Sequence, residues 1–279
     1  MKKKKAFSLF LLGAALLLTG CTNPGVPPTS SSALSSGEEP SSPSTSESLS
    51  SLPTSNDKVR DYYAGVDLSA KGTALRNNLA TFLNTKAFSV PGYSALATTL
   101  PLSDQDLSNA NAFISYYSGK PIPKGTPRGS GTGQWNNEHV WPNSRGSGKD
   151  GPGADPHMLR PTWADSNSSR GNSFYGYASE AGCYDPASEG VTQYRGDAAR
   201  IIFYTATRYG KLNGLELSDN ANDDANLKTM GRKTDLLTWN LAYKPSAQEQ
   251  YRNDYLYSKY NVRNPFIDFP ELATAIWGA

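Results

Sequence analysis

The chain of 279 residues is long enough for one or two domains, and its two cysteines, Cys21 and Cys183, exclude a fold held together by a framework of disulfides. The formal net charge of +2 is unevenly spread, because four positive charges lie at Lys2–Lys5 and three negative charges lie between residues 38 and 47. The remainder, from about Asp57 onward, is nearly neutral. This excludes a strongly basic nucleic-acid-binding surface and leaves local charge or a bound cation to attract any anionic polymer.

Residues 1–20 have the layout of a secretory signal peptide. A basic start is followed by an apolar run from about Ala6 to Leu18, which is too short to span a membrane comfortably. The run ends in Leu-Thr-Gly-Cys21, which is similar to the lipobox of bacterial lipoproteins, where the cysteine is acylated and becomes the mature N-terminus. We therefore expect a lipid on Cys21. The alternative is a plain signal peptide with a cysteine there by chance.

Residues 21–56 are expected to form a disordered tether behind the lipidated cysteine. The stretch from Thr22 to Asn56 consists mostly of Ser, Pro and Thr with three glutamates, so it has almost nothing apolar to bury. Such a tether would hold a domain off the extracellular face of a bacterial cell membrane. The composition changes at Asp57, and we expect one domain over residues 57–279.

Two stretches carry apolar residues at helical spacing. The first predicts a helix over Thr73–Leu83. The second is stronger and predicts a helix over Gly196–Gly210, with Asp197 favouring its start and Gly210 ending it. The expected face of this second helix is formed by Ala198, Ile201, Ile202, Thr205 and Tyr209.

Two capping boxes predict helix starts near the C-terminus. Ser246–Glu249 would open one helix, and Asp268–Glu271 would open a short final helix that ends near Trp277. Glu138–Trp141 is expected to be a short strand, because Val and Trp favour a pleated surface. We find no internal repeat. The many Tyr and Trp residues, with Gly and Pro spread along the chain, favour a loop-rich α+β enzyme over a helical bundle.

Two segments contain the residues suited to chemistry. Trp135–Pro142 holds Glu138 beside His139, and Ala154–Asn172 holds the other histidine with acids, arginines and amides. Histidine is suited to taking a proton near neutral pH, and carboxylate and amide oxygens suit Mg²⁺. Neighbours on a strand point to opposite faces, so Glu138 and His139 can serve one site only if the backbone bends there.

Each of these residues also has an ordinary explanation. A loop histidine is usually solvated or makes a structural hydrogen bond, and Asn167 would ordinarily be a turn or cap residue. Arg160 and Arg170 would ordinarily be solvated or paired with surface acids. A third reading is a small zinc site, for which the candidate ligands are His139, Asp155 and His157.

Both segments resemble those of one known family. The sequence WNNEHVWPNS resembles the WNREHVWPxS motif of the bacterial endonuclease I-like nucleases, and DPHMLRPTWADSNSSRGNSFYG is similar to their second block, DLHxLRPxDxxVNxxRxNxxFG. The segments YYAGVDLSAKGTALRNNL, YRGDAARIIFYTATRYG, LLTWN and RNPFIDFPELATAIW are also similar to parts of this family, so the resemblance runs from about Asp57 to Trp277. Asn137 stands where the motif commonly has Arg, and Pro156 where it commonly has Leu; neither is a matched ligand or base.

The resemblance implies a mixed, mostly helical α+β domain with a ββα-metal (His-Me finger) active site. His139 falls on the general base, and Glu138 and Asn167 fall on the Mg²⁺ ligands. Arg145 lies nearest to the position of the arginine that stabilises the transition state. The residues expected to support the ligands or position the substrate are Asp155, His157, Arg160, Arg170 and Asn172.

The function implied is that of a secreted, membrane-anchored, Mg²⁺-dependent endonuclease. It would hydrolyse DNA, with RNA left open, without sequence preference and leave 5′-phosphate and 3′-hydroxyl ends. Mn²⁺ or Ca²⁺ could stand in for Mg²⁺, and the protein is expected to be a monomer. Two alternatives remain at this stage: a non-catalytic surface lipoprotein that binds nucleic acid, and a zinc-dependent hydrolase.

Overall fold

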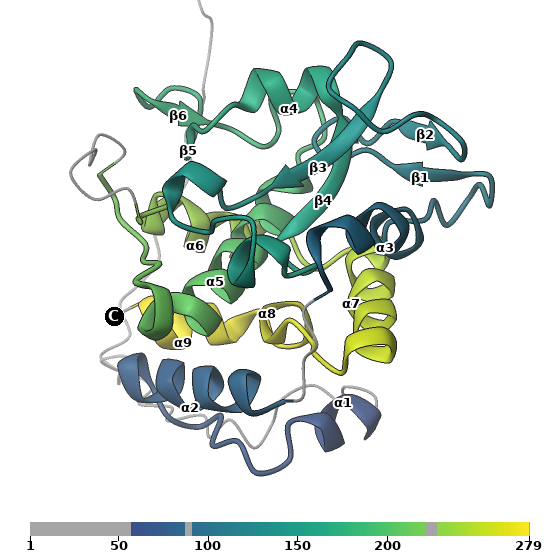
Figure 1. The fold of residues 1–279 in the computed structure, drawn as a ribbon. Helices are drawn as coiled ribbons and strands as arrows, with labels where there is room; N and C mark the ends of the chain where they lie inside the picture. Colours follow the sequence, from purple (N-terminus) through teal and green to yellow (C-terminus); the bar gives the residue numbers. More distant parts are fainter. Residues whose placement is uncertain (1–56, 87–90, 221–227, 279) are drawn as a thin grey trace, which may run out of the picture. The chain divides into compact units, whose positions relative to one another are not determined.

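The computed structural model describes residues 57–86, 91–220 and 228–278, which all belong to one compact unit. The predicted signal peptide, Cys21 and the tether lie outside the described residues. Within the described ranges, none of the helices has the length and apolar character needed to cross a membrane. Figure 1 shows several helices grouped around a long helix, with three pairs of short strands on one side of it. The expected mixed, mostly helical α+β fold is confirmed.

The bounds of the elements follow the chain. The helices are α1 (Asp57–Tyr62), α2 (Gly72–Thr85), α3 (Leu96–Ser103), α4 (Ala164–Arg170), α5 (Tyr194–Asn213), α6 (Lys233–Ala242), α7 (Ala247–Tyr260), α8 (Pro265–Asp268) and α9 (Glu271–Trp277). The strands are β1 (Ala112–Ile114), β2 (Pro121–Pro123), β3 (Trp135–His139), β4 (Leu159–Trp163), β5 (Phe174–Tyr175) and β6 (Cys183–Tyr184). The sheets pair β1 with β2 and β3 with β4 in antiparallel fashion, and β5 with β6 in parallel.

Helix α5 lies at the centre of the helices and contacts α2, α6 and α8 (Figure 1). The predicted face is buried, but so is nearly every other side chain between Tyr194 and Gly210, so α5 is a core helix with no solvent stripe. The predicted end at Gly210 is wrong, since the helix runs on to Asn213 and ends at Gly214 with a φ of 73°. Gly210 instead makes room for Arg76, whose Nη2 would lie only 2.1 Å from an added Cβ.

The two predicted capping boxes have different outcomes. Ser246 caps α7, because its side chain accepts from the Glu249 amide while the Glu249 side chain accepts from the Ser246 amide. The second box is wrong: Pro270 is the residue before α9, and no side chain caps that helix. The Asp268 carboxylate is instead engaged by the Tyr63 hydroxyl and by an ion pair with Arg263. The final helix does end at Trp277 as expected.

Strands β3 and β4 and helix α4 form a continuous ββα unit. β3 and β4 pair antiparallel with Trp135 opposite Trp163 and His139 opposite Leu159, and α4 follows β4 directly. The strand expected at residues 138–141 therefore begins earlier and ends at His139. Its last two expected residues are fully buried but lie beyond the strand. The loop of residues 140–158 begins directly after His139 at the end of β3. It ends at Leu159 of β4, which is paired with His139.

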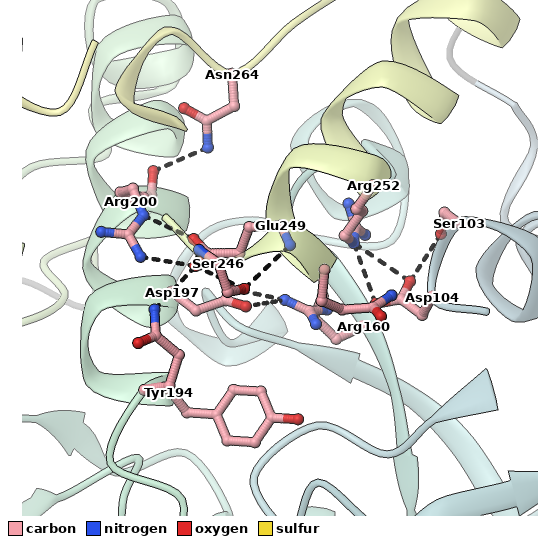
Figure 2. A network of polar contacts seen from close by, with 12 residues as sticks. Ser103, Asp104, Arg160, Tyr194, Asp197, Arg200, Ser246, Glu249, Arg252 and Asn264 are labelled. Carbon is pink, nitrogen blue, oxygen red and sulfur yellow. Dashed lines mark hydrogen bonds and ion pairs between the residues drawn. The ribbon is translucent and has the colours of Figure 1, made fainter. Parts of the chain in front are cut away.

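A buried ionic network ties this unit to the helices (Figure 2). Arg160 of β4 forms ion pairs with Asp104 after α3, at 2.7 Å, and with Asp197 of α5, at 2.6 Å. Asp104 also pairs with Arg252 of α7 at 3.2 Å, and Arg200 of α5 pairs with Glu249 of α7 at 2.7 Å. Asp197, expected to favour the start of α5, is thus an internal partner of β4.

Candidate active site

Glu138 is buried behind the end of β3, and its side chain is 2% exposed. Its Oε1 accepts a hydrogen bond of 2.6 Å from the Tyr117 hydroxyl and lies 3.4 Å from Nη1 of Arg170. Burial raises the pKa of Glu138, while the Arg170 charge and the Tyr117 hydrogen bond act in the opposite direction. Both contacts engage Oε1, which leaves Oε2 for a further partner.

His139 occupies the last position of β3 and is only partly buried. Its Nε2 lies 3.1 Å from the carbonyl oxygen of Gly153. A carbonyl can only accept, so Nε2 carries the proton and Nδ1 keeps its lone pair. Burial lowers the pKa of His139 to about 4, and the charges of Arg170 and Lys149 act in the same direction. The imidazole is therefore neutral at pH 7 and can take a proton at Nδ1.

Asn167 lies in the middle of α4 and faces β3. Its Nδ2 donates to Oδ1 of Asn136 at 2.7 Å and to the carbonyl oxygen of Asn137 at 3.4 Å. Because the amide nitrogen is used in this way, Oδ1 is left as an acceptor. The Asn137 amide atoms are themselves buried and have no hydrogen-bond partner among the residues that the structure describes. Asn167 thus offers an unused amide oxygen beside β3.

These donors fit Mg²⁺. Oε2 of Glu138 and Oδ1 of Asn167 are hard oxygen donors, and Mg²⁺ needs few of them because it keeps several waters and shares its remaining positions with phosphate. The zinc set is not assembled. Asp155 accepts from tyrosine hydroxyls, and Nε2 of His157 donates to Val262 O at 2.8 Å. Within the described ranges, no three His, Cys, Asp or Glu side chains are grouped to hold a metal ion.

Comparisons with known proteins identify the family of the chain. The family model of endonuclease I matches residues 71–271, which include the whole ββα unit. The chain belongs to the endonuclease I family. It is also similar to the extracellular ribonuclease of Bacillus subtilis (strain 168), with 35% identity over 291 aligned positions that cover 98% of this chain and 99% of the relative. The extracellular ribonuclease of Bacillus amyloliquefaciens is 37% identical over 219 positions, covering 74% of each chain.

The remaining candidate residues of this nuclease fall into two groups: some are buried and support the fold, and others lie near the surface. Asp155 is fully buried, and its Oδ2 accepts from Tyr204 at 2.7 Å and from Tyr209 at 2.8 Å. His157 is 2% exposed, and burial lowers its pKa to about 4. Arg160 lies wholly inside the ionic network. These three residues hold the framework and are out of reach of a substrate.

Arg170 binds the end of β3 from the last turn of α4. Its Nη2 donates to Val140 O at 2.8 Å, and its Nη1 donates to His139 O at 3.3 Å. The same Nη1 lies 3.4 Å from Oε1 of Glu138, so a single guanidinium contacts three consecutive residues at the end of β3. At 1% exposure, Arg170 positions the loop and does not reach a phosphate.

Arg145 lies in the loop after β3 and turns toward the residues that follow α4. Its Nε donates to the carbonyl oxygen of Asn172 at 3.1 Å, and its guanidinium lies 5.4 Å from the centre of the Phe174 ring. The exposed Asn172 thus meets Arg145 through its backbone. The structure brings both residues to the edge of the ββα unit. The assignment of Arg145 to the transition state stays a prediction.

Four further residues lie at or near the site, and no motif in the sequence pointed to them. The Tyr93 ring stacks on His139 with centroids 5.6 Å apart, and exposed Arg128 lies 5.6 Å from the Tyr93 ring centre. Exposed Lys149 is close enough to lower the pKa of His139, and Tyr117 reaches Glu138 from the β1–β2 loop. These contacts join segments that are far apart along the chain, so sequence spacing does not show them.

Proposed function

We propose that this nuclease is a secreted, lipid-anchored, Mg²⁺-dependent endonuclease that hydrolyses both RNA and DNA with little sequence preference. The observation that carries the proposal is the arrangement at the end of β3: a neutral histidine with Nδ1 available, a buried carboxylate beside it, and an amide oxygen from α4. The relatives in Bacillus are named extracellular ribonucleases, which supports secretion and RNA as a substrate.

The chemistry of this chain centres on one proton transfer. Nδ1 of His139 takes a proton from a water whose oxygen attacks phosphorus, while Nε2 stays bonded to Gly153 and fixes the orientation of the ring. The bond from phosphorus to the 3′ oxygen breaks, and that oxygen takes a proton from water. Glu138 and Asn167 would hold Mg²⁺. Bound there, it supplies positive charge beside the phosphate as negative charge develops.

Substrate breadth follows from the groups that surround the site. Lys149 is an exposed cation near His139, and exposed Arg128 lies over the Tyr93 ring that stacks on His139. Both cations are suited to phosphate. Phosphate and sugar contacts position a strand without reading its bases. A product with a 5′-phosphate and a 3′-hydroxyl is expected from either nucleic acid.

The test uses purified full-length protein in detergent micelles, incubated with plasmid DNA and with RNA, with Mg²⁺, Mn²⁺, Ca²⁺ or EDTA. We expect EDTA to abolish cleavage, and His139→Ala to reduce the rate by about 10² to 10⁴-fold, the usual contribution of a general base. Glu138→Gln and Asn167→Ala should raise the Mg²⁺ requirement. Glu180→Gln, on a carboxylate paired at the surface with Arg232, is the matched control and should not.

Two results would contradict the proposal. Full cleavage in EDTA would show that the reaction does not need a divalent metal. Full activity of His139→Ala would show that His139 is not the general base. Tight binding of nucleic acid without cleavage under every divalent ion would favour a binding protein instead.

The lipid anchor is tested separately at Cys21. Cells expressing the full chain should hold the nuclease in the membrane fraction, and Cys21→Ser should release it to a soluble fraction or leave it unprocessed. Cys183→Ser is the matched control, since Cys183 lies in β6 as a half-buried free thiol, and it should leave the distribution unchanged. If Cys21→Ser is cleaved to the same mature size and still fractionates with the membrane, anchoring through Cys21 is refuted and the nuclease activity is untouched.

A further inference from the structure

The loop between β1 and β2 contains a tyrosine in an unusual backbone conformation. Tyr117 has a φ of 68°, in the left-handed region that glycine adopts freely and aromatic residues rarely do. The Ser118 amide donates to Tyr116 O at 2.9 Å across it, which closes a tight three-residue turn. Local preference would place glycine or asparagine at this position, so another interaction must favour the tyrosine.

The phenol of Tyr117 supplies that interaction. The side chain is fully buried, and its hydroxyl lies 2.6 Å from Oε1 of Glu138 and 2.5 Å from the hydroxyl of Tyr175. An ionised carboxylate can only accept, so Tyr117 donates to Glu138. Its single proton is then used, and Tyr175 must donate to Tyr117. A directed chain of hydrogen bonds thus ends on one oxygen of the expected metal ligand.

The same oxygen of Glu138 faces a competing cation. Nη1 of Arg170 lies 3.4 Å from Oε1, and the Arg170 guanidinium lies 4.7 Å from the Tyr175 ring centre. A carboxylate next to an arginine tends to rotate so that both oxygens meet the guanidinium fork. Such a rotation would also engage Oε2, the oxygen that neither Tyr117 nor Arg170 contacts. The Tyr117 hydroxyl opposes it, because it binds Oε1 from a fixed, buried position.

We propose that Tyr117 is a positioning residue for the metal site, which holds Glu138 so that Oε2 faces the cation, with Tyr175 in support. The inference rests on the proposed function, in which Glu138 is a Mg²⁺ ligand. It also accounts for the strained turn, because the hydrogen bond from the Tyr117 hydroxyl to Glu138 favours the backbone conformation that places the phenol there. Partners of this kind commonly change metal affinity by 10 to 100-fold when removed.

The test compares two neighbouring tyrosines, each changed to phenylalanine. Tyr117→Phe removes the hydroxyl and keeps the aromatic ring. Tyr116→Phe is the matched control, because Tyr116 is also fully buried but its hydroxyl has no hydrogen-bond partner among the described residues. Calorimetric titration of the full-length protein with Mg²⁺, repeated with Mn²⁺, measures affinity without relying on catalysis. The Mg²⁺ concentration for half-maximal cleavage is the second readout.

We expect Tyr117→Phe to weaken metal binding by about 10 to 100-fold, to raise the half-maximal Mg²⁺ concentration in parallel, and to recover activity at saturating Mg²⁺. Tyr116→Phe should match the wild type in both readouts, and Tyr175→Phe should show a smaller weakening than Tyr117→Phe. A loss of activity that saturating Mg²⁺ does not recover, with unchanged metal affinity, would indicate a merely structural effect and overturn the inference.

The outcomes separate this inference from the proposed function. If Glu138→Gln loses metal binding while Tyr117→Phe binds as tightly as the wild type, the inference fails and the proposed function stands. If the wild type binds no Mg²⁺ and cleaves in EDTA, the proposed function fails and the inference with it. Should Tyr117→Phe not fold, Tyr175→Phe decides: unchanged metal affinity there overturns the inference.

Discussion

The two histidines of the chain show how surroundings assign different tasks to the same side chain. Each donates from Nε2 to a backbone carbonyl, His139 to Gly153 and His157 to Val262. Burial lowers the pKa of each to about 4. They differ in access, since His139 is only partly buried at the end of a strand and His157 is 2% exposed beneath α7 and α8. The first can meet a water and a substrate, and the second cannot.

The low pKa of His157 predicts how stability depends on pH. The unfolded chain takes up a proton near pH 6.5, while the folded protein resists protonation until about pH 4. The stabilising contribution is therefore complete above pH 6.5 and is lost as the pH falls toward 4, by about 3 kcal/mol in total. Urea unfolding of the wild type at a series of pH values measures this loss together with that of His139, whose pKa is also lowered.

His157→Gln is the variant that isolates this contribution. It will be less stable than the wild type at pH 7, because the buried imidazole and its bond to Val262 are lost. The difference between the two proteins should narrow steadily between pH 6.5 and 4. His139 remains in both proteins and cancels in the comparison. Two stability curves that stay parallel through this range would show that His157 does not resist protonation.

Individual elements depend on local signals that a single substitution can remove. In α7 the capping box satisfies two amides at the start of the helix, those of Ser246 and Glu249. Ser246→Ala should lower the free energy of unfolding by about 1 kcal/mol without changing cleavage, because the Ser246 side chain bonds only within the start of α7. Chemical denaturation measures the change. Ser258→Ala, in the exposed last turn of the same helix, is the control and should have a smaller effect.

The success of the sequence predictions differed between elements for a physical reason. The helix at α2 and the cap of α7 were found because periodicity and capping chemistry are contained in a few consecutive residues. The predicted helix end at Gly210 and the predicted helix start at Asp268 were wrong because each residue has a distant partner. Gly210 makes room for Arg76, and Asp268 binds Tyr63 and Arg263. Their residue types resemble local stop and start signals, but the space and charge around them are set by other elements.

The molecule as a whole depends on the buried ionic network around β4 (Figure 2). Arg160 is 1% exposed and pairs with Asp104 and Asp197, which come from opposite sides of the ββα unit. Arg160→Leu would leave two buried carboxylates without this cation. We expect a loss of about 3 to 5 kcal/mol in the free energy of unfolding, the usual effect of breaking a buried pair on one side.

Thermal and urea unfolding test this expectation. The control is Arg60→Leu, which removes an exposed pair with Asp57 and should change stability by about 1 kcal/mol or less. Because the network joins β4 to α3, α5 and α7, the loss in Arg160→Leu should appear as one cooperative shift of the whole transition. A change as small as that of Arg60→Leu would mean that the network is not needed to hold the unit together.

The sequence by itself determined the family, the helical periodicity and the identities of Glu138, His139 and Asn167 as the candidates for chemistry. These are properties of residue type and order, which a motif preserves. Only the tertiary structure decided which nitrogen of His139 is available, which oxygen of Glu138 is occupied, and that Arg160 and His157 support the core. Those answers depend on Gly153, Tyr117 and other groups brought close by folding, because hydrogen bonds and burial act through space.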